Sequence, residues 1–436
     1  MDPTLIGWLG IGLMLGLLAL GAPIYGVLSV VGFAGYWLIA GQDSAMGIVG
    51  LVPYSRLAVY TFTVVPLFIL MGNIVFAAGF GADVYDTSRK WFGRIPGGLA
   101  QATVAACAMF GAASGSTIAT ASTFTRISVP EMLRFGYSPR LALASVAAAG
   151  TISQMIPPSI IMVLYGLITE QSVSRLLIAG ILPGVITAVN YMVMIYFWAK
   201  RHPEIAPMMS EKWNLREAIG ATKGVLGVAI IGAIVMVGIY GGLFTPTEAG
   251  GTGAFAAFIV VVAARRFSFK RLGTSLRETA KTTVMIHAIL LGAFIFSSFI
   301  SITLIPQQIS AFLSDLPVPP IVILLGIMAM YIVLGTVMDI LSALFLTLPL
   351  IFPTVMALGY DPIWFGVLIV HLVGVAVVTP PFGINLFVIK AAMPEAEMGD
   401  IMRGVMPFLA VDMVTLGIYI AFPQVALFLP NQMLGA

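Results

Sequence analysis

Apolar runs long enough to cross a lipid bilayer follow one another along the whole chain. A bilayer core of ~30 Å requires about 20 apolar residues in a helix, and irregular backbone is not tolerated in contact with lipid. Hydrophobic residues make up 60% of the chain and charged residues 9%, whereas soluble domains carry roughly 25% charged residues. The sequence therefore predicts an all-α polytopic membrane protein. The expected helical segments are 4–20, 24–40, 57–80, 98–127, 141–167, 177–199, 224–243, 247–264, 282–304, 319–352, 363–390 and 405–429.

Several functional classes are excluded by composition and motifs. The net charge is only +3, and in a membrane protein the location of Lys and Arg matters more than their number, so we predict no nucleic-acid partner. The single cysteine, Cys107, lies in an apolar run and is expected to be a core residue. The chain has no phosphate-binding loop, and no paired acidic residues, H-E-x-x-H or G-x-S-x-G motif lies in a span. We therefore predict neither ATP hydrolysis nor an enzyme.

The basic residues predict the topology. Nineteen of the 21 Lys and Arg residues fall in segments 81–97, 126–140, 200–223, 265–281 and 390–403. Cytoplasmic loops carry the excess of Lys and Arg, so these segments are expected inside, with Arg56, Arg175 and both termini outside. The first apolar run lacks the basic n-region of a signal peptide and is expected to be retained.

Two apolar stretches must enter and leave the membrane on the same side. Basic segments flank residues 98–127 at both ends, which predicts a re-entrant hairpin turning at 111–116. By the same reasoning from the positions of the basic segments, residues 319–352 begin and end on the outer side and form a second hairpin that turns at 335–339. Small residues at the first turn allow a non-helical backbone to pack inside protein.

Landmark residues recur at a constant offset. Pro23 and Pro246, Gly111 and Gly335, and the pairs starting at Pro157 and Pro380 are separated by 223 or 224 residues. This spacing predicts an inverted structural repeat. Residues 1–200 form the first half with a broken helix at 141–167, 201–223 form a cytoplasmic connector, and 224–436 form the second half with a broken helix at 363–390. The Pro-Pro pairs could alternatively be simple kinks.

The helix breaks and hairpin turns predict where ligands bind. Interrupted helices expose N–H groups that suit a carboxylate and C=O groups that can coordinate Na⁺. Hydroxyl, amide and carbonyl oxygens suit an alkali cation, and no soft-ligand cluster for a transition metal is present. Any single Ser or Thr could equally serve helix packing. The candidate sodium-binding residues are Ser114, Ser116, Thr117, Pro157, Thr336, Asp339, Thr379 and Asn385, and the candidate substrate-binding residues are Ser116, Arg126, Ser159, Thr379 and Pro381.

Ionisable residues inside spans are few, so each is a candidate functional residue. Asp339, at the second hairpin turn, is a candidate for binding a cation or proton. Glu248 fits a capping box that starts at Thr245. His287 and His371 are expected to be hydrogen-bonded packing residues rather than proton relays. Arg126 is expected to snorkel to the interface, with contact to an anionic substrate as the alternative.

At these motifs the chain resembles a known family. The run Gly111-Ala-Ala-Ser-Gly-Ser-Thr-Ile-Ala-Thr-Ala, followed by Pro130-Glu131-Met132, resembles the first-hairpin signature of the large membrane subunit of TRAP (tripartite ATP-independent periplasmic) transporters, the DctM-like permeases. Further motifs resemble the family in the expected order. They are Gly150-Thr151 with Ile156-Pro157-Pro158-Ser159, Thr245-Pro246-Thr247-Glu248-Ala249, and Thr379-Pro380-Pro381-Phe382-Gly383-Ile384-Asn385-Leu386. Arg126 and Ser153-Gln154 look unlike the family's commoner small or apolar residues.

The resemblance implies a mechanism and partners. Such proteins are similar to elevator-type members of the ion-transporter superfamily, in which a transport domain with both hairpins and both broken helices slides against a scaffold. They import organic acids with Na⁺, with four-carbon dicarboxylates as the family default. A periplasmic substrate-binding protein delivers the organic anion, and a small membrane subunit of about four spans, expected here as a separate chain, completes the scaffold. The implied location is the bacterial inner membrane, in contact with lipid.

Other transporter classes remain open at the level of sequence. A stand-alone Na⁺- or H⁺-coupled organic anion symporter of the same architecture would need no soluble partner. A channel fits less well, because inverted, broken repeats suit alternating access. The substrate is not determined by the sequence: sialic acids, other sugar acids, aromatic acids, keto acids and ectoine-like zwitterions are alternatives to dicarboxylates.

Overall fold

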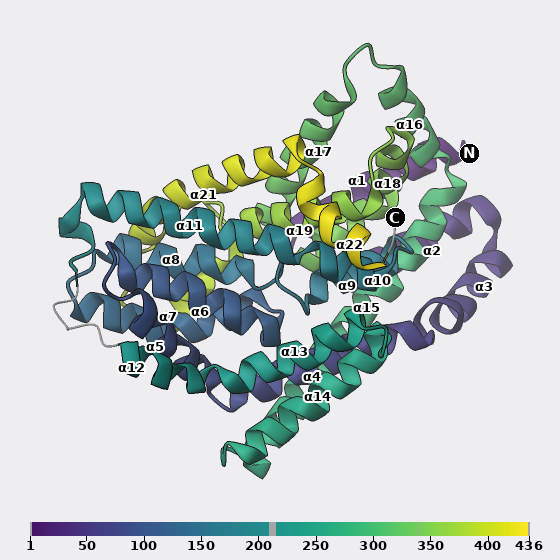
Figure 1. Ribbon diagram of the computed structural model, residues 1–436. Coiled ribbons are helices and arrows are strands. Elements are labelled where there is room, and N and C mark those ends of the chain that lie inside the picture. Colours follow the sequence, from purple (N-terminus) through teal and green to yellow (C-terminus); the bar gives the residue numbers. More distant parts are fainter. Residues whose placement is uncertain (1, 209–214, 339, 435–436) are drawn as a thin grey trace.

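The computed structural model describes residues 2–208, 215–338 and 340–434, and every regular element in these ranges is a helix (Figure 1). This confirms the prediction of an all-α polytopic membrane protein. Six helical segments within the described ranges are long and apolar enough to cross a membrane, and several apolar helices of 10–17 residues accompany them. The six are Tyr60–Ala77, Val173–Arg201, Pro246–Ala263, Phe269–Ile302, Ile340–Ala357 and Met398–Ala421.

One group of helices packs around the long helix α15 (Phe269–Ile302). α15 lies along α2 and α4, and α14 packs between α4 and α13. The contact with α2 is close: a Cβ on Gly32 would lie only 2.7 Å from Phe296 Cα, so the absence of a side chain at Gly32 allows the two helices to approach. The other members of the group are α1 (Pro3–Ala19), α2 (Ile24–Ala40), α4 (Val64–Ala77), α13 (Leu226–Tyr240) and α14 (Pro246–Ala263).

A second group contains the first hairpin and the two broken helices. α6 and α7 form the hairpin, and α8 packs against both of them and against α21. Small side chains make this packing possible, since α6 is lined with Ala and Gly and is buried on nearly every side. The group comprises α6 (Gly98–Ser114), α7 (Thr117–Arg134), α8 (Pro139–Ile152), α9 (Ile160–Ile168), α10 (Val173–Ala179), α11 (Ile181–Arg201), α19 (Pro362–Ala376), α20 (Ile384–Ala392), α21 (Met398–Ala421) and α22 (Gln424–Leu434).

The second hairpin consists of α17 (Pro320–Val337) and α18 (Ile340–Ala357). α17 packs on α19, whereas α18 packs on α15 and on α16 (Ile305–Asp315). Figure 1 shows α6 and α7 in the left half of the molecule and α16, α17 and α18 at the upper right. Each hairpin thus precedes a broken helix in the chain, although the opposite membrane orientation of the two halves stays a prediction.

The remaining helices are short and were not expected as separate elements. They occur where the predicted spans begin, end or are connected. The chain turns through them because Gly and Pro interrupt the longer helices. They are α3 (Gln42–Val52), the π-helix η1 (Pro53–Leu57), the 3₁₀ helices η2 (Tyr60–Thr63), η3 (Pro203–Ile205) and η4 (Thr222–Gly224), α5 (Phe80–Phe92) and α12 (Leu215–Ala221).

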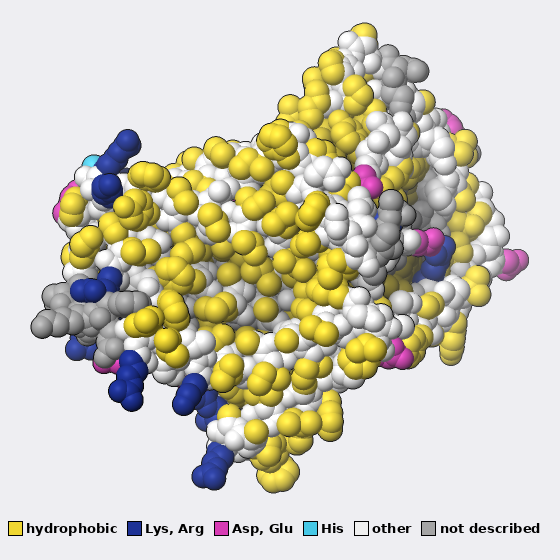
Figure 2. All heavy atoms as spheres, in the orientation of Figure 1, with side chains coloured by type: hydrophobic (Ala, Val, Ile, Leu, Met, Phe, Trp, Pro, Cys, Tyr) yellow, Lys and Arg dark blue, Asp and Glu magenta, His cyan; other side chains and the backbone are white. Residues whose placement is uncertain are grey.

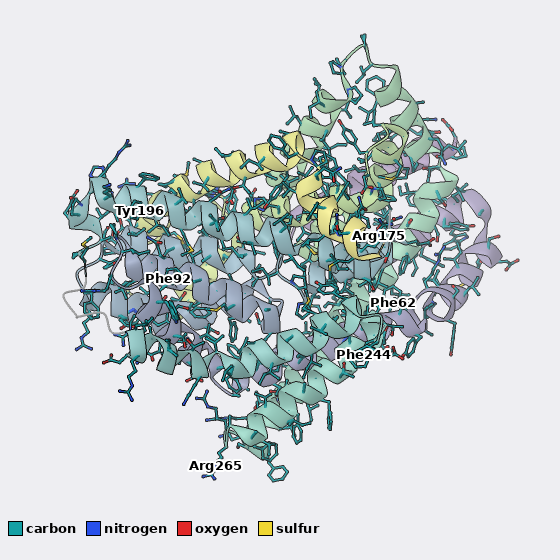
Figure 3. The ribbon with its side chains drawn as sticks, in the orientation of Figure 1. Phe62, Phe92, Arg175, Tyr196, Phe244 and Arg265 are labelled. Carbon is teal, nitrogen blue, oxygen red and sulfur yellow. The ribbon has the colours of Figure 1, made fainter. Side chains whose placement is uncertain are left out.

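Charge is distributed unevenly over the face drawn in Figure 2. Lys and Arg side chains gather along its left and lower edges, while an apolar surface covers most of the region between these edges and the right side. Figure 3 locates one landmark of this pattern: Arg265 follows α14 at the lower edge, and Phe244 precedes α14 at its other end. Whether these basic edges face the cytoplasm stays a prediction.

Three predictions about single residues are confirmed. Thr245 and Glu248 form a reciprocal capping box at the start of α14, in which the Glu248 carboxylate accepts from the Thr245 backbone N–H at 2.8 Å. Cys107 is fully buried in the core. His287 is hydrogen-bonded as expected, with Nδ1 lying 2.9 Å from the Thr283 carbonyl oxygen.

Candidate functional site

The turn of the first hairpin packs directly on the first helix break. Gly115 has φ +58°, and a Cβ there would overlap the carbonyl oxygen of Pro158. Gly111 is equally constrained, because its Cβ would lie 2.6 Å from Ser153 Cα. Only residues without side chains allow backbone to approach backbone in this way. Gly111 and Gly115, which the sequence suggested as part of a turn, therefore allow the first hairpin to pack closely against the first break.

Both broken helices are interrupted near a Pro-Pro pair, which is buried at the first break and partly exposed at the second. α8 ends at Ile152 and α9 begins at Ile160, and the equivalent interruption separates α19 from α20. The Pro157–Pro158 and Pro380–Pro381 peptide bonds are both cis. Proline removes a backbone donor and blocks helix continuation, so unpaired helix ends occur at both places.

The two breaks lie side by side. Gln154, in the first break, donates from Nε2 to the carbonyl oxygen of Val370 on α19 at 2.8 Å. Asn385, at the start of α20, donates from Nδ2 to the carbonyl oxygen of Ala147 on α8 at 3.4 Å. The end of α17 joins them, because a Cβ on Gly335 would lie 2.5 Å from the Ala376 side chain. Both hairpins and both breaks thus meet in one region.

The predicted hydroxyl residues have partners within their own helices or turns. Ser114 Oγ lies 3.1 Å from Thr120 Oγ1, and Ser116 Oγ caps α7 by accepting from Ala119 N at 3.3 Å. Thr336 and Thr379 donate to the carbonyl oxygens of Val333 and Val375, each at 2.7 Å. A hydroxyl keeps free lone pairs after such a bond, so these residues are still able to act as ligands.

Of the other predicted ion-site residues, Thr117 and Pro157 are buried beside the turn and the first break. Asp339 lies outside the described residues. Whether any of these side chains binds Na⁺ stays a prediction.

Two amide oxygens in this region are buried and have no hydrogen-bond partner within the described part of the chain. They are Asn385 Oδ1 and Gln154 Oε1, one beside each break. A buried polar atom without a partner is costly and is rare in native structures. Amide oxygens are hard donors suited to an alkali cation, so each of these two atoms is a candidate ligand. Gln154 was noted in the sequence only as an unusual residue, and its depth beside the break was not foreseen.

The predicted substrate residues differ in accessibility. Ser159 is fully buried and caps α9 by accepting from Met162 N at 3.2 Å. Ser116 and Thr379 are half-buried, and Pro381 is exposed. Arg126 is exposed on α7, which agrees with snorkelling and leaves its guanidinium able to meet a solute. Because α7 and α9 both begin here, their N-terminal amides favour an anion.

A buried acid beside the breaks escaped the sequence analysis. Asp412 on α21 is 1% exposed and accepts a hydrogen bond from the Tyr191 hydroxyl at 2.6 Å. Its Oδ1 lies 3.4 Å from His371 Nε2, and the His371 ring packs edge-on against Tyr419. His371 precedes the second break on α19, so this cluster supports the helix that carries the break. An aspartate inside an apolar run was the signal that could have revealed it.

Broken helices paired with helical hairpins define a class: multi-pass helical membrane proteins with the architecture of secondary transporters. Residues 11–425 match the family model described as "Tripartite ATP-independent periplasmic transporter, DctM component", and the chain belongs to this family. The resemblance inferred from the sequence motifs is therefore confirmed.

Two relatives and one solved structure illustrate the similarity. The C4-dicarboxylate TRAP transporter large permease protein DctM of Pseudomonas aeruginosa is 35% identical, over 85% of this chain and 86% of that protein. The sialic acid TRAP transporter large permease protein SiaM of Vibrio cholerae is 28% identical, over 99% of each chain. The Alcanivorax borkumensis YdaH transporter superposes with a TM-score of 0.61 at 14% identity, covering 98% of this chain and 100% of that chain. The last similarity concerns the fold alone.

Proposed function

We propose that this chain is the large membrane subunit of a secondary active transporter that imports a small organic anion together with Na⁺. A carboxylate is the proposed cargo, with C4-dicarboxylates as the first candidates. A periplasmic binding protein delivers the substrate, and a small membrane subunit of about four spans completes the complex in the bacterial inner membrane, with both termini on the periplasmic side.

One observation carries this proposal: two amide oxygens that have no hydrogen-bond partner among the described residues, Asn385 Oδ1 and Gln154 Oε1, lie buried beside the two helix breaks. An oxygen that lacks a donor in the protein is available to a cation, and Na⁺ is a cation whose ligands are oxygen atoms. α7 and α9 begin in the same region, and their N-terminal amides favour an anion. Binding of both ions at neighbouring points would couple the movement of one to the movement of the other.

The relatives support the class of cargo. The names of the Pseudomonas aeruginosa and Vibrio cholerae proteins state a C4-dicarboxylate and sialic acid, respectively. Both are organic acids, although they differ in size and polarity. A site built mainly from backbone amides and small hydroxyl residues suits a carboxylate without selecting the rest of the molecule. The proposal therefore names the chemical class of the substrate, an organic acid, rather than one compound.

We further propose that transport uses an elevator movement. The group around α15 would be the scaffold, and the group containing both breaks, together with the second hairpin α17–α18, would move against it. The two groups meet through α4 and α13 against α6, and through α15 against α18. The α4–α6 contact is close to the site itself, since a Cβ on Gly72 would lie 2.8 Å from the Ser114 carbonyl oxygen.

Reconstitution tests the proposed function. The chain would be purified with its small membrane subunit, placed in proteoliposomes and supplied with substrate-loaded binding protein under an inward Na⁺ gradient. Uptake of labelled succinate or N-acetylneuraminate is expected only when both Na⁺ and the binding protein are present. Uptake of free substrate without the binding protein would instead support the stand-alone symporter, and uptake unaffected by replacing Na⁺ with K⁺ would refute sodium coupling.

A further inference from the structure

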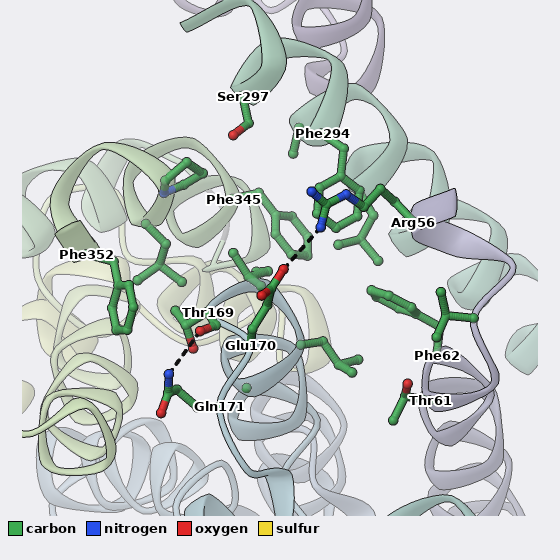
Figure 4. A pocket seen from close by; sticks show the side chains of 18 of the residues that line it. Arg56, Thr61, Phe62, Thr169, Glu170, Gln171, Phe294, Ser297, Phe345 and Phe352 are labelled. Carbon is green, nitrogen blue, oxygen red and sulfur yellow. Dashed lines mark hydrogen bonds and ion pairs between the residues drawn. The ribbon is translucent and has the colours of Figure 1, made fainter. Parts of the chain in front are cut away.

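A large cavity lies away from the helix breaks, between the two groups of helices (Figure 4). Its volume is about 940 Å³, within the range of small-molecule sites, about 300–1,000 Å³. One wall comes from residues 48–62 and from 290–301 of α15, and the other from residues 166–174 and from 345–353 of α18. The cavity therefore opens between the proposed scaffold and the proposed moving group.

The lining combines apolar rings with hydroxyl groups. Phe62, Phe294, Phe345 and Phe352 face the cavity, and Phe62 and Phe294 pack edge to face with ring centroids 6.3 Å apart. Hydroxyl residues occur on both walls, among them Thr61, Ser297 and Ser298 on one side and Thr169 and Ser172 on the other. Such a surface accommodates a small molecule that has both polar groups and a carbon skeleton.

Only two charged residues occur among the described residues that line this cavity, Arg56 and Glu170. Arg56 Nη1 lies 3.1 Å from Glu170 Oε1, and the guanidinium carbon lies 6.0 Å from the centroid of the Phe294 ring. The pair joins the two walls, because Arg56 belongs to η1 and Glu170 follows α9 (Figure 4). The two side chains are 56% and 77% exposed, and an ion pair between exposed groups is weak. Another carboxylate can therefore displace Glu170 from Arg56.

Glu170 has a left-handed backbone conformation, with φ +56°. The conformation belongs to a Schellman motif that ends α9, in which the backbone N–H of Gln171 donates to the carbonyl oxygen of Gly166 at 2.8 Å. The motif turns the chain sharply after α9, so Glu170 lies in the loop that connects α9 to α10.

The cavity is connected to the first break by a single short helix. α9 begins at Ile160, beside the break, and ends at Ile168, next to Thr169 and Glu170 in the cavity lining. Nine helical residues at ~1.5 Å each span roughly 14 Å. A solute in the cavity is therefore separated from the break by about the length of α9, and both positions are linked by one rigid element.

We propose that this cavity is a docking site where the carboxylate of the incoming substrate binds Arg56 in place of Glu170, before the substrate reaches the helix breaks. This inference rests on the proposed function. Arg56 supplies the positive charge and a fork of donors suited to a carboxylate. Glu170 occupies the guanidinium when no substrate is present and so competes with the substrate for it.

The competition distinguishes this role from a simple latch between the two walls. Arg56→Gln removes the anion-binding group, whereas Glu170→Gln removes only its competitor. For a docking site, the KM for uptake should rise by up to about fivefold in Arg56→Gln and fall by up to about threefold in Glu170→Gln, the scale of an ion pair between exposed groups. For a latch, both substitutions break the same bond and must change KM in the same direction. Arg175→Gln is the control, because Arg175 is predicted on the same side of the membrane, contacts Asn431 at 2.9 Å and does not line the cavity.

Cysteine labelling tests the docking site without requiring transport. Ser297→Cys places a thiol in the cavity lining, and the native Cys107 is 0% exposed and will not react. The purified complex, in phosphatidylcholine vesicles that contain no anionic lipid, would be labelled with a maleimide in the presence of succinate or N-acetylneuraminate. Protection is expected with Arg56 present, stronger in Glu170→Gln and lost in Arg56→Gln.

The outcomes separate the two proposals. Equal protection in all three proteins, or protection in none of them, would overturn the docking site even if sodium-driven uptake is normal. The expected protection pattern without sodium- and binding-protein-dependent uptake would refute the proposed import function and leave the docking site supported.

Discussion

The close approach of the first hairpin to the first break predicts a large effect from adding a single methyl group. In Gly111→Ala the new Cβ would lie 2.6 Å from Ser153 Cα and 2.9 Å from Ser153 Cβ. Because carbon atoms pack at about 3.5–4.0 Å, α6 and the break must separate by roughly 1 Å. Overpacking of this kind costs typically ~1–3 kcal/mol, while alanine gains about 0.5–1 kcal/mol over glycine in a helix. We expect a net destabilisation of about 1–2 kcal/mol.

Thermal unfolding of the purified protein in detergent measures this effect. One kcal/mol corresponds to about 2–4 °C in chains of 150–250 residues and to less in longer ones, so the midpoint is expected to fall by about 1–4 °C. Gly12→Ala is the matched control, since Gly12 lies within α1 and a Cβ there meets nothing within 4 Å. If Gly111→Ala unfolds at the same temperature as the wild type and Gly12→Ala, the close contact between α6 and the first break is refuted.

Two further substitutions address the buried polar groups near the breaks. Asn385→Ala removes an amide oxygen that has no partner among the described residues, and we expect the Na⁺ concentration for half-maximal uptake to rise about tenfold, equivalent to about 1.4 kcal/mol. Asn190→Ala is the control and should leave the sodium titration unchanged. An unchanged titration in Asn385→Ala would remove Asn385 from the proposed ion site. Asp412→Ala leaves the buried Tyr191 hydroxyl without its acceptor and should destabilise the protein by about 1–3 kcal/mol. Asp412→Asn keeps an acceptor for the Tyr191 hydroxyl and should cost less, so equal unfolding midpoints for the two variants would contradict the proposed pairing.

Features that depend on local backbone chemistry were predictable from the sequence. Proline cannot continue a helix, which is why the interruptions after Ile152 and Ala376 fall at the Pro-Pro pairs. Gly115 ends α6 in a left-handed conformation that glycine adopts without strain. Thr245 and Glu248 carry the spacing of a capping box, and the structure contains that capping box.

The helix bounds were harder to predict where polar residues continue a helix. The first hairpin was expected to end at residue 127, yet α7 continues to Arg134. The extra turns contain Glu131, which lies 3.1 Å from Arg89 Nη1 on α5. A partner on another helix thus makes a charged residue acceptable within the packed structure, and the hydrophobicity of the sequence does not reveal that partner.

Pairings between distant segments could not be predicted at all. Arg56 and Glu170 are 114 residues apart in the chain, and Asp412 meets His371 and Tyr191 from three different helices. These contacts depend on how each helix is rotated about its axis and on which neighbour it packs against. A single sequence gives the apolar runs but not those rotations, so the cavity and the buried acid became visible only in the folded chain.

The burial of α6 has a consequence for how the protein is made. α6 contacts α4 and α5, which are synthesised before it, but also α8, α11 and α13, which follow it in the chain. The last of these ends at Tyr240, about 126 residues after Ser114, which takes roughly 6–25 s at ~5–20 residues per second. Until the end of that interval α6 lacks part of its permanent surroundings, although α4 and α5 are already present. The first hairpin is therefore among the earliest parts of the chain to leave the ribosome and among the last to reach its final environment.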